Sequence, residues 1–228
     1  MQVSYPSAAT LPKRLQETLA APPYAQRSVT SGAILHKRIF DVVFAALVVV
    51  FLLSWLAPLI AVLIKLESKG PAFFKQLRTG KDGQVFYCLK FRSMTVNADA
   101  DIKQACKNDC RVTKIGAFLR KTSLDEFPQF LNVLKGEMSV VGPRPHMLRH
   151  TQEFSNSIKY YMDRHLIMPG ITGLAQVSGY RGEVTELDAL TKRVNADIYY
   201  LHNNSLRLDV KIVWLTVVQL FKWNKNAY

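Results

Sequence analysis

The chain has 228 residues, of which 49% are hydrophobic and 21% are charged. This composition excludes an intrinsically disordered protein and supplies enough apolar material for one large folded domain. Thirty Lys and Arg residues against 17 Asp and Glu give a net charge of +13, which predicts contact with nucleic acid, an anionic membrane surface or a phosphorylated substrate. The three cysteines cannot close into a disulfide framework and are typical of a reducing compartment.

Residues 1–33 contain four prolines among Ser, Ala, Thr and Gln, without sustained hydrophobic periodicity. Such a stretch is interpreted as a mobile lead, and no function is assigned to it. The next segment is the opposite in character, because Val42 to Ile64 contains no charged residue. As a straight α-helix this run would reach about 34 Å, enough to cross a hydrocarbon core of about 30 Å.

Pro58 lies inside the apolar run, where it lacks an N–H and its ring clashes with the carbonyl of Ser54. We therefore expect the helix to kink between these two residues. Basic residues flank the run at both ends, so the positive-inside rule gives no orientation. A re-entrant hairpin places both ends on one side of the membrane, and an ordinary kinked span is the alternative.

Beyond the membrane run, segments 71–78 and 84–92 flank the sequence GKDG at 80–83, and alternating apolar residues in the second segment predict a β-hairpin. Segment 98–110 is polar and is predicted as a surface helix or loop. Residues 209–222 indicate a helix whose uncharged part is too short to span. It either packs as a core helix, which we favour, or lies among the lipid headgroups.

An amphipathic helix is predicted where Leu124, Phe127 and Leu131 recur at three- and four-residue steps, with Gly136 as its stop. Ser123 and Glu126 have the spacing of a capping box at its start. Asp125 would then lie in the first turn, where the helix dipole favours a carboxylate and also a bound phosphate. Ordinary capping is the alternative explanation of this acidic pair.

Three arginines lie near this stretch or downstream of it. Arg120 precedes the predicted cap, and Arg144 lies between Pro143 and Pro145, whose rings stiffen the backbone around it. Arg181 follows a glycine-rich loop that could approach a ligand closely. A guanidinium on a stiff backbone loses less freedom when it binds a phosphate. A solvated arginine and plain glycine turns are the alternatives.

The chain resembles the bacterial sugar transferases, monotopic phosphoglycosyl transferases that load sugar phosphates onto polyprenyl phosphate. The resemblance covers about residues 36–221 and includes the apolar run. Two departures are an Ala-Pro helix break where relatives often have Ser-Pro, and the lack of the extra N-terminal membrane helices of many longer relatives. The matching motifs occur in the family order: KRIFD at 37–41, KFRSM at 90–94, LRKTSLDE at 119–126, VGPRP at 141–145, PGITGLAQ at 169–176 and LRLDVK at 206–211.

The resemblance implies an α+β, mainly helical fold with a small β-hairpin and one kinked re-entrant membrane helix that breaks at Ser54 and Pro58. It divides the chain into a mobile lead (1–35), the membrane helix (36–66) and a cytoplasmic catalytic domain with interfacial helices (67–228). The implied location is the cytoplasmic face of the bacterial inner membrane.

The resemblance also implies a catalytic dyad, Asp125 and Glu126, with Mg²⁺ as cofactor and both carboxylates as candidate ligands. Arg120, Arg144 and Arg181 are the implied phosphate-binding residues. Asp125 would attack the sugar-bearing phosphorus of a UDP-sugar and expel UMP, and polyprenyl phosphate would then take the hexose-1-phosphate from the aspartyl intermediate. Glu126 would either bind the metal or orient Asp125.

The implied partners are a UDP-sugar, polyprenyl (undecaprenyl) phosphate and membrane lipids, and no nucleic acid is expected. UDP-glucose is the first candidate donor and UDP-galactose the second, for exopolysaccharide or capsule synthesis. A homo-oligomer is left open. Two other functions also fit: a membrane-tethered basic module that only binds anions, and a catalytically silent scaffold of a polysaccharide assembly complex.

Overall fold

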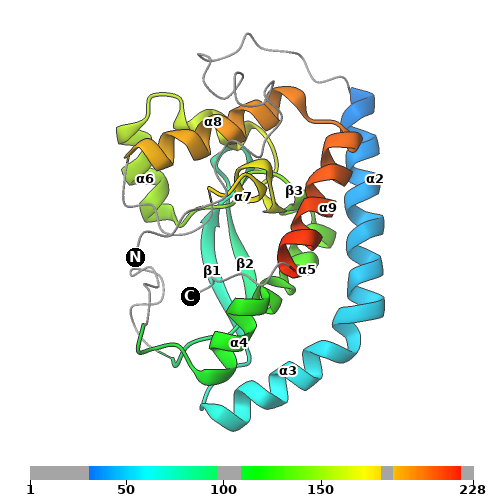
Figure 1. The fold of residues 1–228 in the computed structure, drawn as a ribbon, viewed down its shortest axis with the longest axis vertical. Coiled ribbons are helices and arrows are strands. Elements are labelled where there is room, and N and C mark those ends of the chain that lie inside the picture. The colour runs from blue at the N-terminus through cyan, green and yellow to red at the C-terminus, as the bar shows by residue number, and fades with distance from the viewer. Residues whose placement is uncertain (1–30, 97–108, 181–186, 222–228) are drawn as a thin grey trace.

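The computed structural model describes residues 31–96, 109–180 and 187–221 (Figure 1). Most of the predicted lead, the polar segment 98–110 and Arg181 therefore lie outside the described residues. In chain order the long elements are α2 (Ser31–Val48), a π-helical turn η2 (Val49–Leu53), α3 (Ser54–Glu67), β1 (Phe73–Thr79), β2 (Val85–Phe91), α4 (Lys114–Thr122), α5 (Gln129–Lys135), β3 (Ser139–Val141), α6 (Leu148–Ser157), β4 (Gly170–Thr172), α7 (Leu174–Val177), α8 (Leu187–Asn203) and α9 (Leu206–Phe221). Short 3₁₀ turns are η3 (Lys81–Gly83), η4 (Leu124–Glu126) and η5 (Tyr161–Leu166).

The apolar run forms one continuous helix through α2, η2 and α3. It has 33 residues from Leu35 to Glu67, and its most apolar 18-residue stretch has a mean hydropathy of 2.9, so by length and composition it could cross a membrane. The helix bends, so that α2 runs along the protein body while α3 turns beneath it (Figure 1). Pro58 lies in α3 as expected, and the π-helical turn directly before α3, which the sequence analysis did not predict, lies in the same region.

The inner face of α2 is joined to the body by polar contacts. Arg38 donates hydrogen bonds to the carbonyl oxygens of Val133 (2.8 Å) and Leu134 (3.1 Å) at the end of α5. Asp41, which is 3% exposed, accepts a hydrogen bond from the backbone N–H of Val140 in β3. The first half of the apolar helix is therefore a packed part of the body.

The predicted β-hairpin is confirmed. Strands β1 and β2 pair antiparallel, with Gln76 opposite Cys88. The turn uses Asp82 (φ 53°) and Gly83 (φ 75°), because a reversal this tight needs left-handed backbone.

A second pair of strands was not predicted. Strands β3 and β4 are parallel, and they lie so close that a Cβ on Gly170 would lie 2.0 Å from the backbone nitrogen of Gly142. A Cβ on Gly173 would lie 2.2 Å from the carbonyl oxygen of Gly142. These glycines of the 169–176 motif therefore allow backbone to pack on backbone.

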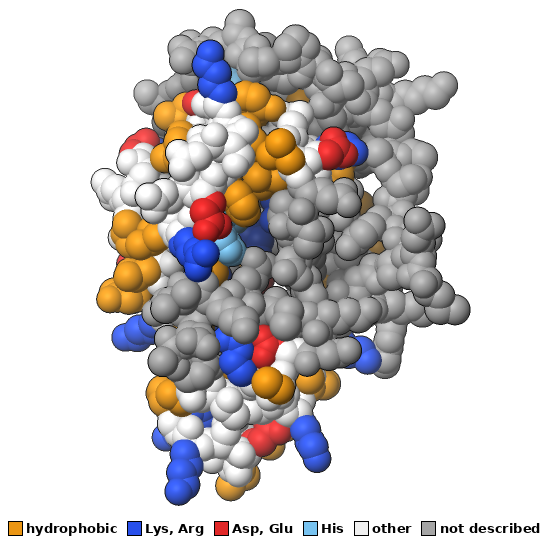
Figure 2. Space-filling model, turned by 90° about the vertical axis from the view of Figure 1, so that its left-hand side faces the viewer, with side chains coloured by type: hydrophobic (Ala, Val, Ile, Leu, Met, Phe, Trp, Pro, Cys, Tyr) orange, Lys and Arg blue, Asp and Glu red, His pale blue; other side chains and the backbone are white. Residues whose placement is uncertain are grey.

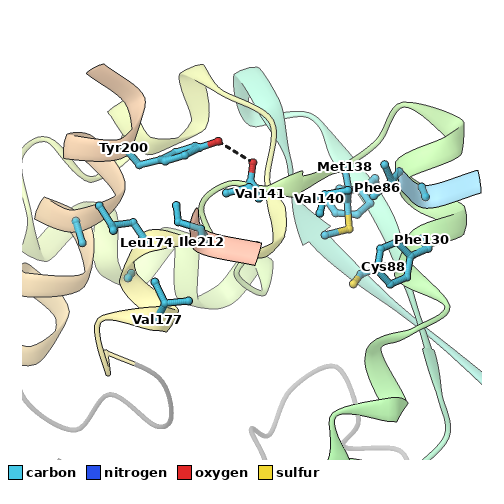
Figure 3. Packing of buried hydrophobic residues seen from close by; sticks show 14 residues of the cluster. Phe86, Cys88, Phe130, Met138, Val140, Val141, Leu174, Val177, Tyr200 and Ile212 are labelled. Carbon is cyan, nitrogen blue, oxygen red and sulfur yellow. Dashed lines mark hydrogen bonds between the residues drawn. The ribbon is translucent and has the colours of Figure 1, made fainter. Parts of the chain in front are cut away.

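The main core lies between the strands and the C-terminal helices. Figure 3 shows Phe86, Cys88, Phe130, Met138 and Val140 on one side of it and Val141, Leu174, Val177, Tyr200 and Ile212 on the other. The hydroxyl of Tyr200 lies 3.1 Å from the carbonyl oxygen of Val141, which joins α8 to β3. Helix α9 buries Ile212 in this core, as favoured from the sequence, while its outer face leaves Trp214 66% exposed.

Helix α4 is attached to the end of the apolar helix. The carboxylate of Glu67 accepts hydrogen bonds from the backbone N–H groups of Lys114 (2.6 Å) and Ile115 (2.9 Å), which are first-turn donors without helical partners. The hydroxyl of Thr113 accepts a third, from the N–H of Gly116 (2.9 Å). The last residue of α3 thus fixes where α4 begins.

Gly116→Ala is expected to lower the free energy of unfolding by about 1–3 kcal/mol. The new Cβ would lie 1.9 Å from the carbonyl oxygen of Ser93, so backbone must move, and this outweighs the gain of about 1 kcal/mol that alanine gives in an open helix. Denaturant titration in detergent measures the change. Lys114→Ala, at an exposed position of the same helix, is the control and should change stability by less than about 0.5 kcal/mol. Equal stability of the two variants would contradict the prediction.

Candidate active site

The acidic pair lies in the 3₁₀ turn η4 between α4 and α5, and the predicted capping box is wrong. Ser123 ends α4 with left-handed backbone (φ 58°), and its side chain caps neither helix. Asp125 therefore does not lie in the first turn of an α-helix. The predicted C-terminal end of this helix is confirmed, because α5 stops at Gly136, whose φ is 86°. The box fails because Glu126 binds side chains from elsewhere in the chain.

Glu126 lies between two cations. Its carboxylate accepts a hydrogen bond from Lys90 on β2 (2.7 Å), and Arg144 forks onto both of its oxygens (2.5 and 3.1 Å). All three side chains are largely shielded from solvent, with exposed fractions of 10% for Glu126, 16% for Lys90 and 30% for Arg144. Charge-assisted and bidentate pairs of this kind are stronger and more directional than neutral hydrogen bonds. Glu126 therefore fixes the turn η4 against β2 and against the Pro-Arg-Pro turn.

Asp125 is buried, with 9% of its surface exposed. Among the described residues, none forms a hydrogen bond or ion pair with its carboxylate. Burial, followed by the negative charge of Glu126, raises its pKa to about 6, although Lys90, Arg120 and Arg144 all act to lower it. A buried carboxylate that lies among cations, and that no described residue binds, is typical of a reactive group.

The two described phosphate-binding candidates both lie near the pair. Arg120 is in the last turn of α4, where its Nε donates to the hydroxyl of Ser93 (2.8 Å) and burial lowers its pKa. Arg144 contacts Glu126 directly, and that charge raises the pKa of Arg144. Lys90 lies in the motif at 90–94, but no role was expected for it from the sequence. Its position near the end of β2, facing the acidic turn, depends on the hairpin register and on chain pairing that no local pattern predicts.

The donor set fits a magnesium ion through one carboxylate. Mg²⁺ commonly takes one or two protein carboxylates and completes its shell with water and phosphate oxygens. Asp125 has oxygens to offer, whereas those of Glu126 are held by Lys90 and Arg144. Within the described part of the chain, no group of three or more His, Cys, Asp or Glu side chains gathers as a protein-only metal cage.

The acidic turn also packs against the apolar helix. Leu124 and Phe127, on either side of the pair, join a cluster with Ile60 and Ile64 of α3 and with Leu119 of α4. Lys and Arg side chains project at the lower end of the molecule (Figure 2), the end at which Figure 1 shows α3 and α4. The candidate site therefore lies beside the helix that has the length and composition of a membrane segment.

Comparison with known proteins gives the family. The sequence profile of the bacterial sugar transferases matches residues 32–223. The chain belongs to the bacterial sugar transferase family. Three proteins named UDP-glucose:undecaprenyl-phosphate glucose-1-phosphate transferase are similar to it. The Klebsiella pneumoniae protein is 50% identical over an alignment that covers 84% of this chain and 41% of the relative. The Escherichia coli K12 protein is 47% identical, and the alignment covers 96% of this chain and 47% of the relative. The Caulobacter vibrioides protein is 48% identical, and the alignment covers 85% of this chain and 72% of the relative.

This sugar transferase chain spans less than half the length of the Klebsiella and E. coli relatives. The family match includes the apolar helix as well as the acidic turn, so both belong to the shared region. Family membership and the apolar helix together indicate membrane association.

Asp125→Asn is expected to stabilise the fold at neutral pH. The raised pKa means that the Asp125 carboxyl binds its proton more tightly in the native protein than in the unfolded chain. The stability that this bound proton contributes is complete below pH 3.8 and is lost as the pH rises through about 6. Removing the charge should therefore add about 1–3 kcal/mol at pH 7.5. The gain should vanish near pH 3.5.

Denaturant titration of the wild-type protein and the variant at both pH values measures this difference. Asp188→Asn, at a surface position whose side chain is 72% exposed, serves as the control and should show no comparable gain. A less stable Asp125→Asn protein at pH 7.5 would refute the raised pKa.

Proposed function

We propose that this chain transfers a hexose-1-phosphate from a UDP-sugar to polyprenyl (undecaprenyl) phosphate and releases UMP, as the first membrane step of exopolysaccharide or capsule synthesis. The observation that carries the proposal is Asp125, a buried carboxylate among Arg120, Arg144 and Lys90 to which no described residue forms a hydrogen bond or ion pair. The names of the similar proteins specify a UDP-sugar donor and an undecaprenyl-phosphate acceptor for those proteins. A site with these charges suits both anionic substrates.

In the proposed first step, a carboxylate oxygen of Asp125 attacks the sugar-bearing phosphorus. A phosphorus–oxygen bond to Asp125 forms while the bond to UMP breaks, and UMP leaves with the electron pair. In the second step, an oxygen of polyprenyl phosphate attacks the same phosphorus, and the bond to Asp125 breaks. The carboxylate is restored without any net proton transfer, so two anionic substrates use one site in turn.

The charges of the site support this sequence. The cations Lys90, Arg120 and Arg144 face the two carboxylates of Asp125 and Glu126, which leaves one positive charge in excess. That excess favours an incoming phosphate and offsets charge that develops on the transferring phosphoryl group. Bound Mg²⁺ would supply further compensation of phosphate charge, with Asp125 as the protein ligand that the geometry favours.

The role proposed for Glu126 follows from its contacts. Because its oxygens are engaged by Lys90 and Arg144, we assign it to positioning those cations and, through the backbone of η4, to positioning Asp125. Of the two roles that the sequence left open for Glu126, we therefore propose orientation over metal binding. Arg181 remains a proposed phosphate-binding residue in a segment outside the described residues.

We further propose that the apolar helix is re-entrant and that the site faces the cytoplasm at the inner membrane. The bend between α2 and α3 and the basic residues at both ends of the run support this topology. The packing of Leu124 and Phe127 on α3 would hold Asp125 at the height of lipid headgroups. A polyprenyl phosphate and a soluble nucleotide sugar could meet there.

Purified protein is expected to exchange labelled UMP into UDP-glucose without any lipid acceptor, because the first step alone is reversible. EDTA should abolish the exchange. Asp125→Asn should reduce it to background, whereas the surface control Asp188→Asn should retain it. UDP-glucose is expected to support faster exchange than UDP-galactose. Exchange that persists in Asp125→Asn, or a phosphosugar adduct found by mass spectrometry on another residue, would refute the covalent route.

The same assay tests the two other functions. A basic binding module or a silent scaffold predicts no exchange with any UDP-sugar and an Asp125 that can be replaced without effect.

The re-entrant topology predicts that both ends of the apolar helix face the cytoplasm. In a variant whose Cys88, Cys106 and Cys110 are replaced by Ala, single cysteines at His36 and Lys69 should both resist a membrane-impermeant maleimide in intact spheroplasts. Both should react in inverted membrane vesicles. Labelling of one position from the periplasmic side would show a spanning helix.

A further inference from the structure

The Pro-Arg-Pro turn that carries Arg144 is held by its carbonyl groups. Pro143 and Pro145 have no backbone N–H, so they can be hydrogen-bonded only through oxygen. The carbonyl of Pro143 accepts from the backbone N–H of Gly170 (2.9 Å), and that of Pro145 accepts from the Nη1 of Arg78 (3.0 Å). The carbonyl of Arg144 itself, between them, accepts from the Nη2 of Arg164 (2.8 Å).

Arg164 is among the most deeply buried side chains described, with 2% of its surface exposed. Its Nε and Nη2 both donate to Oδ2 of Asp197 on α8, at 2.9 and 2.7 Å. Its guanidinium carbon lies 5.4 Å from the centre of the Tyr161 ring. Asp197 is also 2% exposed, so burial desolvates the whole pair.

Because Asp197 holds the Arg164 guanidinium in place, the Nη2 of Arg164 is a fixed hydrogen-bond donor to the carbonyl oxygen of Arg144. Because Asp197 neutralises the guanidinium, the pair adds little net charge near the dyad, and its effect on the turn is geometric. The carbonyl that it holds belongs to the residue whose side chain forks onto Glu126. A chain of direct contacts thus runs from Asp197 through Arg164 and Arg144 to Glu126, the neighbour of Asp125.

We propose that Arg164, held by Asp197, is a positioning residue that fixes the Arg144 guanidinium for substrate phosphate and for Glu126. The part of this inference that concerns substrate phosphate rests on the proposed function. The part that concerns the position of Arg144 against Glu126 is independent of it. Neither Arg164 nor Asp197 bonds to Asp125 or Glu126, so we assign their effect on the dyad to the backbone of the turn.

Arg164→Lys is the decisive variant, because it keeps the positive charge but loses the planar fork that reaches Asp197 and the Arg144 carbonyl together. The KM for UDP-glucose in the exchange assay should rise about tenfold or more, with a smaller change in kcat. In an Arg144→Met background, the same substitution should cause no further rise in KM, because its effect passes through Arg144. An equal rise in both backgrounds would overturn the proposal.

A second readout does not require turnover. When Arg144 loosens from Glu126, the ¹⁵N NMR signals of its guanidinium, assigned by their loss in Arg144→Met, should broaden and move toward those of a solvated arginine. If the wild-type protein shows no exchange, the proposed function fails, yet these signals still test the positioning. Unchanged Arg144 signals in Arg164→Lys would overturn the proposal.

Val194→Ala is the matched control, since Val194 is fully buried on the same helix as Asp197 and packs beside Tyr161. It should lower the unfolding temperature without moving the KM or the Arg144 signals. Should Arg164→Lys fail to fold, Asp197→Asn tests the chain of contacts from its other end and should raise KM in the same direction. Equal effects of Val194→Ala and the ion-pair variants on KM and on the Arg144 signals would reduce the pair to a structural role and overturn the proposal.

Discussion

The pairing of one carboxylate with two cations is the constraint on which the candidate site depends. Glu126 joins three parts of the fold that are distant in sequence: the turn η4, strand β2 through Lys90, and the Pro-Arg-Pro turn through Arg144. Without this carboxylate, Lys90 and Arg144 would repel one another in a shielded environment. With it, the two cations can lie beside Asp125 while no described residue bonds to the Asp125 oxygens. Within this pair of carboxylates, Glu126 therefore has direct cationic partners, whereas Asp125 is buried without one among the described residues.

The apolar helix contributes to the site as a packed wall. Its first half is fastened to the body by Arg38, Lys37 and Asp41, and Lys37 lies 2.9 Å from the buried carboxylate of Asp209 on α9. Its second half packs against the residues that flank the dyad. A segment that serves only as an anchor needs no such polar contacts with the rest of the chain. The apolar helix and the candidate site are therefore packed against one another in one body.

Local patterns predicted the parts of the fold that local interactions decide. The apolar helix, the hairpin and the stop at Gly136 all follow from composition, alternation and backbone preference over a few residues. The capping box failed because the partners of Glu126 lie 36 and 18 residues away, and charge-assisted pairs override a cap. The parallel pairing of β3 with β4 and the contact of Arg164 with the Arg144 carbonyl are likewise long-range. The motifs named the residues of the site but not how they are supported.

The hydrogen bonds from α4 to Glu67 couple the position of Asp125 to that of the apolar helix. Since the last residue of α3 receives the first N–H groups of α4, a tilt of one helix carries the other with it. Asp125 follows α4 after a short turn, so under the proposed topology the depth of α3 in the membrane would set the distance of Asp125 from the bilayer surface. Acyl-chain length and bilayer thickness would then affect the proposed chemistry through the position of these two helices, without any contact with the reactants.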